Sequence, residues 1–212
     1  METWLKYLIV IVLSYLLGSL NFSIIISKGM LGRDVRQFGS GNAGSTNAYR
    51  MMGGKKTLLV MAGDLLKGVL AVLLGGLLFG ELGHFGGHGK LIAGLCVMLG
   101  HMFPLYFGFR GGKGVMTAAA VFGVFDVRIL AIILSVFLIV VLLTRYVSLA
   151  SMCAAAAVPV SMAIFYGFDA FYFPVALVIA ALVIFLHRAN IGRLLRHEER
   201  RFSWKRKGSG NE

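Results

Sequence analysis

Long apolar runs separated by short polar segments dominate the chain. Six of these runs approach the ~20 residues that a helix needs to cross the hydrocarbon core of a bilayer. They span residues 6–27, 57–79, 91–107, 129–143, 147–166 and 171–186. A seventh run, residues 115–125, is shorter but carries no charge. The pattern predicts an all-α integral membrane protein with seven transmembrane helices; five or six spans with a re-entrant segment are the alternative.

Composition supports the same class of protein. Hydrophobic residues make up 58% of the 212 residues and charged residues only 14%, whereas soluble domains are about 25% charged and under half apolar. A globule of this size keeps much of its surface wet, so it could not bury so many apolar side chains. The net charge of +12 indicates anionic partners, either lipid headgroups or phosphorylated substrates. We expect the lipid bilayer as a partner and no nucleic acid.

The distribution of basic residues sets the expected topology. With seven spans, 17 of the 21 Lys and Arg residues fall on one side of the membrane and three on the other, while Lys67 lies within a span. The positive-inside rule then places the N-terminus outside and the C-terminus in the cytoplasm. If residues 115–125 did not cross, every later basic loop would change sides and the asymmetry would disappear.

The first expected cytoplasmic loop, residues 37–50, is rich in glycine and in neutral hydrogen-bond donors. Gly39, Gly41 and Gly44 let the backbone approach a ligand closely. The polar side chains of this loop are Ser40, Asn42, Ser45, Thr46, Asn47 and Arg50. The planar guanidinium group of Arg50 suits phosphate. The same residue types equally fit a polar connector with helix caps, so composition leaves both interpretations open.

The second expected cytoplasmic loop, residues 108–114, reads Gly-Phe-Arg-Gly-Gly-Lys-Gly and precedes Thr117. It opens the short seventh run, so free backbone N–H groups and the helix dipole would form an anion site with Lys113 at its mouth. The loop is not a nucleoside-triphosphate P-loop, because Phe107 and Gly114 occupy the positions of that motif's first glycine and its Ser or Thr. The alternative is a tight hairpin with stop-transfer charges.

Other polar groups lie within or at the ends of spans. Asp64 and Lys67 are three residues apart and can pair on one helix face. Together with His101 they are functional candidates inside the membrane, although a structural ion pair is an equal alternative. Further groups at the cytoplasmic ends of later spans are Arg145, Ser148, His187, Asn190 and Arg193. Seven spans would bring these groups and both glycine loops to one membrane surface, which predicts a single site rich in phosphate binders.

Taken in order, these segments resemble the motifs of the bacterial acyl-phosphate:glycerol-3-phosphate acyltransferases, the PlsY family. The matching positions are residues 39–42, Gly44, Thr46, Asn47 and Arg50; Asp64, Lys67 and Gly68; Gly100, His101, Pro104, residues 111–114 and Thr117; residues 144–148; and His187, Asn190 and Arg193. The resemblance extends from about residue 18 to residue 202. The sequence differs from the usual family pattern at residues 20–23, at Met116 and at His197. These differences concern local helix geometry and acyl-chain preference more than the reaction.

The resemblance implies transfer of a fatty acyl group from acyl phosphate to the 1-hydroxyl of glycerol 3-phosphate, which yields lysophosphatidic acid and inorganic phosphate. This would be the first committed step of phospholipid biosynthesis, at the bacterial plasma (inner) membrane. Acyl phosphate is already an activated mixed anhydride, so neither a nucleophilic Ser or Cys nor a metal or cofactor is required. Positioning of two phosphates and an acyl tail can itself lower the barrier by several kcal/mol.

The residues expected to act in this reaction fall into two groups. The catalytic group comprises Lys113, Arg50, Ser40, His187 and Asn190. The substrate-binding group comprises Gly39, Gly41, Asn42, Gly44, Thr46, Asn47, Lys67, His101, Gly111, Gly112, Gly114, Thr117, Arg145 and Ser148. The first glycine loop, Arg50 and Lys113 are assigned to phosphate binding and leaving-group stabilisation. Ser148, His187 and Asn190 are assigned to the orientation of glycerol 3-phosphate.

The general base is open among three candidates: His187, His101 and a phosphate oxygen of the substrate. No His has a carboxylate nearby in sequence to orient it, which favours substrate-assisted catalysis.

A transporter or channel for a small phosphorylated anion is the main alternative function. It predicts polar residues that continue through the spans to the outer side, whereas intramembrane charge here stops at Asp64, Lys67 and His101. We expect one polytopic domain, residues 1–198, and a basic, flexible cytoplasmic tail, residues 199–212. Docking of the soluble enzyme that produces acyl phosphate is a conceivable role of this tail.

Overall fold

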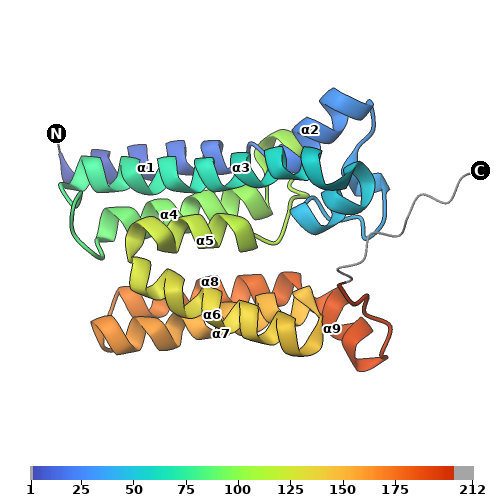
Figure 1. Cartoon of the computed structure of the whole chain (residues 1–212). Coiled ribbons are helices and arrows are strands. Elements are labelled where there is room, and N and C mark those ends of the chain that lie inside the picture. Colours follow the sequence, from blue (N-terminus) through green and yellow to red (C-terminus); the bar gives the residue numbers. More distant parts are fainter. Residues whose placement is uncertain (1, 203–212) are drawn as a thin grey trace, which may run out of the picture.

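The computed structural model describes residues 2–202, and this part of the chain is helical without strands. The long helices form two layers (Figure 1). One layer contains α1 (Thr3–Gly18), α3 (Ser45–Phe79), α4 (His88–Met102) and α5 (Val115–Phe125). The other contains α6 (Val127–Thr144), α7 (Val147–Tyr166) and α8 (Tyr172–Leu186). The short helices α2 (Phe22–Leu31) and α9 (Arg188–Leu195) lie at the same end of the bundle.

Within residues 2–202, five helical segments are long and apolar enough to cross a membrane. A sixth is obtained if α8 and α9, which are bent by 56° relative to each other, count as one span. Helix α5 has 11 residues and is therefore about 16 Å long, well below the ~30 Å of a hydrocarbon core. The all-α membrane class is thus confirmed, and the number seven stays a prediction.

The first apolar run is interrupted, although the sequence predicts one continuous span over residues 6–27. Helix α1 ends at Gly18, and α2 begins at Phe22 after Asn21, whose side chain accepts a hydrogen bond from Ile24 N at 3.2 Å. The break frees backbone carbonyls, and Lys67 Nζ donates to two of them, Gly18 O at 3.0 Å and Leu20 O at 2.9 Å. Irregular backbone at this depth is tolerated because Lys67 satisfies it.

Small residues bring α1 and α4 into close contact. A side-chain carbon on Gly18 would overlap the carbonyl of Val97, and one on Gly100 would overlap the carbonyl of Tyr15. Such backbone-to-backbone approach is typical of helices that associate in a membrane, where packing replaces the hydrophobic effect as the main attraction.

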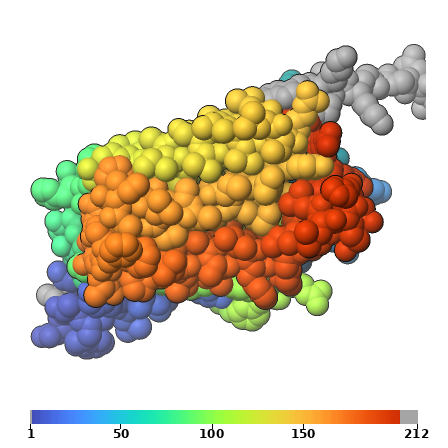
Figure 2. Space-filling view, turned by 90° about the horizontal axis from the view of Figure 1, so that it is seen from below, coloured from blue at the N-terminus to red at the C-terminus, as the bar shows by residue number. Residues whose placement is uncertain are grey.

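Large apolar side chains fill the space between the two layers. Phe122, Phe125, Met98, Ile129 and Met162 all lie in this core with 1% exposure or less. The outer faces are apolar as well, and Figure 2 shows the exposed surface of α6, α7 and α8. Their exposed residues include Leu138, Ile139, Leu142, Leu143, Val160 and Ile164. A surface of this kind is suited to lipid.

At the end of the bundle opposite α2 and α9 (Figure 1), a buried carboxylate makes polar contacts with neighbouring side chains. Asp126 is fully buried and accepts hydrogen bonds from Tyr166 Oη at 2.8 Å and Arg128 Nη2 at 2.7 Å. The guanidinium of Arg128 lies over the rings of Phe85 and Phe165, 4.7 and 4.3 Å from their centroids. These contacts bind α6 and α7 to the connection between α3 and α4.

Candidate active site

The first glycine loop is organised by the side chain of Asn47. Its Nδ2 donates to Val35 O at 2.9 Å and to Phe38 O at 2.8 Å, and its Oδ1 accepts from Ser40 N at 3.1 Å. The loop turns through Gly39 and Gly41, at φ of 60° and 70°. Both values lie in the left-handed region that glycine adopts most readily. Asn47 therefore holds the loop in shape and has no amide atom left over for a phosphate.

The loop is shorter than the sequence predicts. We expected a loop to residue 50, but α3 begins at Ser45 with Gly44 as its N-cap. Thr46 and Arg50 consequently lie on the first turns of a helix, which is bent at Gly53, where φ is 74°. Their polar character misled the prediction, because Ser, Thr and Asn are favoured at helix starts as much as in loops. Arg50 is exposed and lies within electrostatic reach of Arg193, Arg200 and Glu199.

The second glycine loop folds back along the end of α4. Gly111 N donates to Met102 O and Gly112 N donates to His101 O, both at 3.1 Å. A side-chain carbon on Gly111 would overlap His101 O, and one on Gly112 would overlap the imidazole of His101. The glycines are required here because the backbone touches its neighbours directly. Gly114, at φ 79°, then precedes α5 as predicted.

Lys113 joins the second glycine loop to α9. Its ammonium donates to Asn190 Oδ1. Burial lowers the pKa of Lys113 to about 8, the positive charges of Arg193 and Arg50 act in the same direction, and the carboxylate of Glu199 opposes them. The ammonium is thus still mainly protonated at neutral pH and can bind a phosphate, whose negative charge would compensate for the hydration lost on burial.

Glu199 is the residue that sequence reasoning missed. Its Oε1 accepts from Ser148 Oγ at 2.8 Å and from Asn190 Nδ2 at 2.7 Å, while its Oε2 accepts from Arg193 Nε at 2.6 Å. Burial raises the pKa of Glu199, but these three hydrogen bonds outweigh it and hold the pKa below its usual value. The charge pattern alone assigned residue 199 to the tail. Glu198 and Glu199 are the two acidic residues within a basic segment, and this isolation could have indicated a specific role.

A pocket of about 330 Å³ opens between the two glycine loops and α9. Its lining consists of Ser40, Gly41, Asn42, Met102, Phe103, Phe109, Arg110, Gly111, Gly112, Lys113, Leu186, Arg188, Ala189, Asn190 and Arg193. Four of these residues are basic and none of the lining is acidic, while Phe103, Phe109 and Leu186 provide apolar surface. This pocket is therefore suited to an anion that carries an apolar tail.

Several expected site residues lie outside this pocket. Lys67 and His101 are buried and contact each other, with Nζ 2.9 Å from Nδ1, and Lys67 pairs with Asp64 at 2.9 Å. Thr117 is fully buried where α5 packs on Gly68 of α3, and Arg145, at φ 61°, ends α6. Of these side chains, the imidazole of His101 lies directly against Gly112 of the second loop.

His187 lies between α8 and α9, beside the pocket. It is 3% exposed, and its Nδ1 is 2.8 Å from Val183 O. A carbonyl can only accept, so Nδ1 carries a proton. Burial and the charge of Lys113 lower the pKa of His187 to about 4, so the ring is neutral at pH 7 and Nε2 carries no proton. The backbone carbonyl of His187 accepts from Asn190 N at 2.8 Å in the first turn of α9.

Comparison with known proteins places the chain in a family. A family model described as glycerol-3-phosphate acyltransferase matches residues 8–197. The glycerol-3-phosphate acyltransferase of Geobacillus kaustophilus is 39% identical over 201 residues, which cover 95% of this chain and 98% of that protein. The enzyme of the same name from Clostridioides difficile is 40% identical over 205 residues, with 95% and 98% coverage.

Two crystal structures of PlsY, an integral membrane glycerol 3-phosphate acyltransferase, have the same fold. The glycerol 3-phosphate form matches with a TM-score of 0.85 at 39% identity and covers 93% of this chain and 96% of that one. The lysophosphatidic acid form matches with a TM-score of 0.81 at 38% identity, with 93% and 95% coverage. This chain therefore belongs to the glycerol-3-phosphate acyltransferase family.

Proposed function

We propose that this chain transfers a fatty acyl group from acyl phosphate to the 1-hydroxyl of glycerol 3-phosphate, forming lysophosphatidic acid and inorganic phosphate. The observation that carries the proposal is the pocket between the two glycine loops. It combines Lys113 and further basic side chains with apolar surface from Phe103, Phe109 and Leu186. Both substrates are phosphates, and one of them also has an acyl chain, so the pocket fits their common chemistry.

The reaction needs positioning more than a nucleophile from the protein. The 1-hydroxyl oxygen attacks the acyl carbonyl carbon, a new C–O ester bond forms, and the C–O bond to the phosphate breaks. Negative charge develops on the carbonyl oxygen and on the leaving phosphate. Lys113 and the other basic side chains of the pocket would stabilise this charge. Ser148, Asn190 and His187 would orient the acceptor, with Glu199 fixing Ser148 and Asn190.

A phosphate oxygen of the substrate is the proposed acceptor of the hydroxyl proton. His101 is a poor alternative because it is 3% exposed, its Nδ1 faces Lys67 and Asp64, and its ring abuts Gly112. His187 keeps a free Nε2 and remains the competing base. If a His187→Ala variant loses substrate affinity but keeps its turnover, His187 is excluded as the base.

We further propose seven crossings, with the N-terminus outside and the site at the cytoplasmic face of a bacterial inner membrane. The hydrogen bond from Gly86 N to Phe125 O, 2.9 Å, supports a crossing by α5, because it joins the end of α5 to the connection before α4. A cysteine placed at Lys113 should be shielded from an impermeant thiol reagent in intact cells and react after lysis. Reaction in intact cells would show that residue 113 faces the outside and would contradict the proposed orientation. A soluble enzyme that produces acyl phosphate would meet the basic residues of this face.

A transporter for a phosphorylated anion is less well supported. It would need a polar path to the opposite end of the bundle, where Asp126, Arg128 and Tyr166 are engaged with one another. The charged groups between the two ends, Asp64 and Lys67, are likewise paired and buried.

The test of the proposed reaction uses the purified full-length protein with acyl phosphate and glycerol 3-phosphate and no added metal. Phosphate release should require both substrates and should fall about 10²–10³-fold in a Lys113→Ala variant, the usual effect of losing one transition-state donor. No release, or equal rates in the variant, would contradict the proposal. The matched control is Lys55→Ala, which removes an exposed cation of α3.

A further inference from the structure

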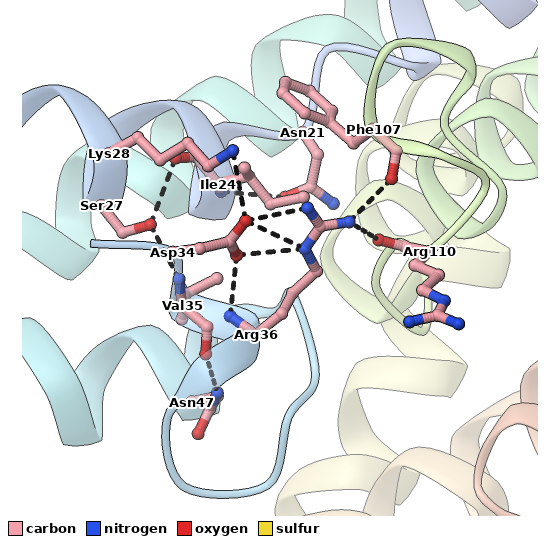
Figure 3. A network of polar contacts seen from close by, with 10 residues as sticks. All are labelled: Asn21, Ile24, Ser27, Lys28, Asp34, Val35, Arg36, Asn47, Phe107 and Arg110. Carbon is pink, nitrogen blue, oxygen red and sulfur yellow. Dashed lines mark hydrogen bonds and ion pairs between the residues drawn. The ribbon is translucent and has the colours of Figure 1, made fainter. Parts of the chain in front are cut away.

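A cluster around Asp34 and Arg36 joins the two glycine loops (Figure 3). Arg36 Nη1 donates to Phe107 O at 2.7 Å and to Arg110 O at 3.2 Å. The other edge of the guanidinium binds Asp34, through Nη2 at 2.8 Å and Nε at 3.0 Å. One side chain from η1 (Val35–Gln37) therefore holds two carbonyls of the segment that leads to Lys113.

The segment that Arg36 holds has an unusual backbone. η2 (Leu105–Phe107) is followed by Gly108 at φ 65° and Phe109 at φ 58°. The left-handed region is unfavourable for a residue with a side chain, so Phe109 needs support from its surroundings. Phe109 N donates to Pro104 O at 3.0 Å, and Arg36 binds the carbonyls on either side of the two left-handed residues. Arg36 thus fixes both ends of this turn, and we refer to its contacts with Phe107 O and Arg110 O as the clamp.

The clamp acts on both walls of the pocket without being part of its lining. Arg36 belongs to the segment that leads into the first loop, where Ser40, Gly41 and Asn42 line the pocket. The turn that it binds leads into the lining residues Arg110 to Lys113. Arg36 therefore links the two loops through its side chain, in addition to the direct approach of Gly112 to Ala43.

We propose that Arg36, oriented by Asp34, is a positioning residue that fixes the register between the two glycine loops and hence between the two substrates. The inference rests on the proposed function, in which the glycine loops bind the acyl donor and Lys113, at the end of the second loop, contacts Asn190 of the acceptor site. Each loop keeps its own internal hydrogen bonds without Arg36. Loss of the clamp should therefore leave both substrates bound but displaced relative to each other.

The chemistry of the contact requires arginine. A guanidinium presents five N–H donors in a planar fork, so it can bind two carbonyls on one edge and a carboxylate on the other. A lysine keeps the positive charge but offers a single point donor, which cannot span the same partners. Asp34 is ionised at neutral pH, since its hydrogen bonds with Arg36 hold its pKa at about 2. Lys28 also pairs with Asp34, at 3.3 Å.

The test measures how the acyl group partitions between glycerol 3-phosphate and water. Displaced substrates admit water, whose oxygen attacks the same acyl carbon and gives a fatty acid and inorganic phosphate. The ratio of lysophosphatidic acid to enzyme-formed fatty acid does not depend on how much of a variant is folded. We expect Arg36→Lys and Arg36→Gln in the full-length protein to lower this ratio at least tenfold, and Asp34→Asn to lower it less.

The matched controls are Arg33→Lys and Arg33→Gln, which change an exposed arginine three residues earlier and should leave the ratio within twofold. A ratio within twofold of the wild type in Arg36→Lys would overturn the inference. If the wild type makes no lysophosphatidic acid, the proposed function itself fails. If the wild type is active and Lys113→Ala is not, an unchanged ratio in Arg36→Lys refutes the clamp alone.

Discussion

Lys113 lies where the second glycine loop meets α9, and its charge depends on its neighbours. Its ammonium donates to Asn190, while Arg193 and Glu199 act on it with opposite signs. A lysine with a pKa of about 8 loses its proton only slightly above neutral pH. The proposed role of Lys113 needs the cation, so activity should follow this titration.

The first prediction concerns the alkaline limb of the pH profile. For the wild type, kcat/KM for acyl phosphate should be constant near neutral pH and fall as the pH rises through about 8, because kcat/KM reports groups of the free enzyme. Lys113→Arg should retain part of the activity and show no fall up to about pH 9.5, since arginine stays charged. An unchanged limb in Lys113→Arg would assign the titration to another group.

The second prediction concerns Glu199. Its carboxylate raises the pKa of Lys113, so Glu199→Gln should move the alkaline limb to lower pH and reduce kcat/KM at pH 7 about tenfold or more. Glu198→Gln is the matched control, because Glu198 is exposed and pairs only with Arg196 among the described contacts. A limb that stays in place or moves upward in Glu199→Gln would show that Glu199 does not act on Lys113.

The sequence indicates which polar residues lie in the two glycine loops, but it does not indicate which partners their side chains bind. Asn47 was expected to bind substrate, whereas its amide is occupied by Val35, Phe38 and Ser40. A sequence does not reveal whether an amide is turned toward a ligand or toward its own backbone. Glu199 was missed for a related reason, since its three partners come from two helices and only the fold brings them together.

The third prediction tests the contact between the second glycine loop and α4. In Gly112→Ala the new methyl group would overlap the ring of His101 and would lie 2.6 Å from Ala43 O. Overpacking of this kind costs about 1–3 kcal/mol, so we expect a lower melting temperature and at least a tenfold loss of activity. Gly29→Ala in α2 meets nothing within 4 Å and should preserve both. Full activity in Gly112→Ala would mean that the loop does not pack as described.

The fourth prediction concerns the buried pair that supports the break after α1. Lys67→Met leaves Asp64 and two carbonyls of the break without their donor, and removal of one partner of a buried ion pair costs about 3–5 kcal/mol. Thermal unfolding in detergent should reveal this loss, and a double variant with Asp64→Leu should recover part of it. If Lys67→Met melts like the wild type, the pair does not stabilise the junction.

Helix identity could be predicted from the sequence, and helix ends could not. The apolar runs correspond to helices, and the start of α5 after Gly114 was correct. The break at residues 19–21 was missed because it occurs inside an apolar run and is stabilised by Lys67, which is nearly fifty residues away. The start of α3 at Ser45 was missed because the polar residues of its first turn resemble a loop.

The two ends of the molecule differ in character: one carries the pocket and the other is held together by side-chain contacts. Both glycine loops, α9 and the pocket lie at one end, as the predicted convergence requires. The opposite end is held by Asp126, Arg128 and Tyr166. Net charge and hydropathy could predict this polarity because the membrane imposes it on the whole sequence. They could not fix the number of crossings, since α5 is shorter than a bilayer is thick.

The most direct test of the central claim follows the oxygen that bridges acyl and phosphate in the donor. Acyl phosphate labelled with ¹⁸O at this bridging position is supplied to the purified protein with glycerol 3-phosphate, and the products are analysed by mass. Acyl transfer breaks the bond between the acyl carbon and the bridging oxygen, so the label should appear in inorganic phosphate and lysophosphatidic acid should be unlabelled. Absence of lysophosphatidic acid, or label retained with the acyl group, would contradict the account.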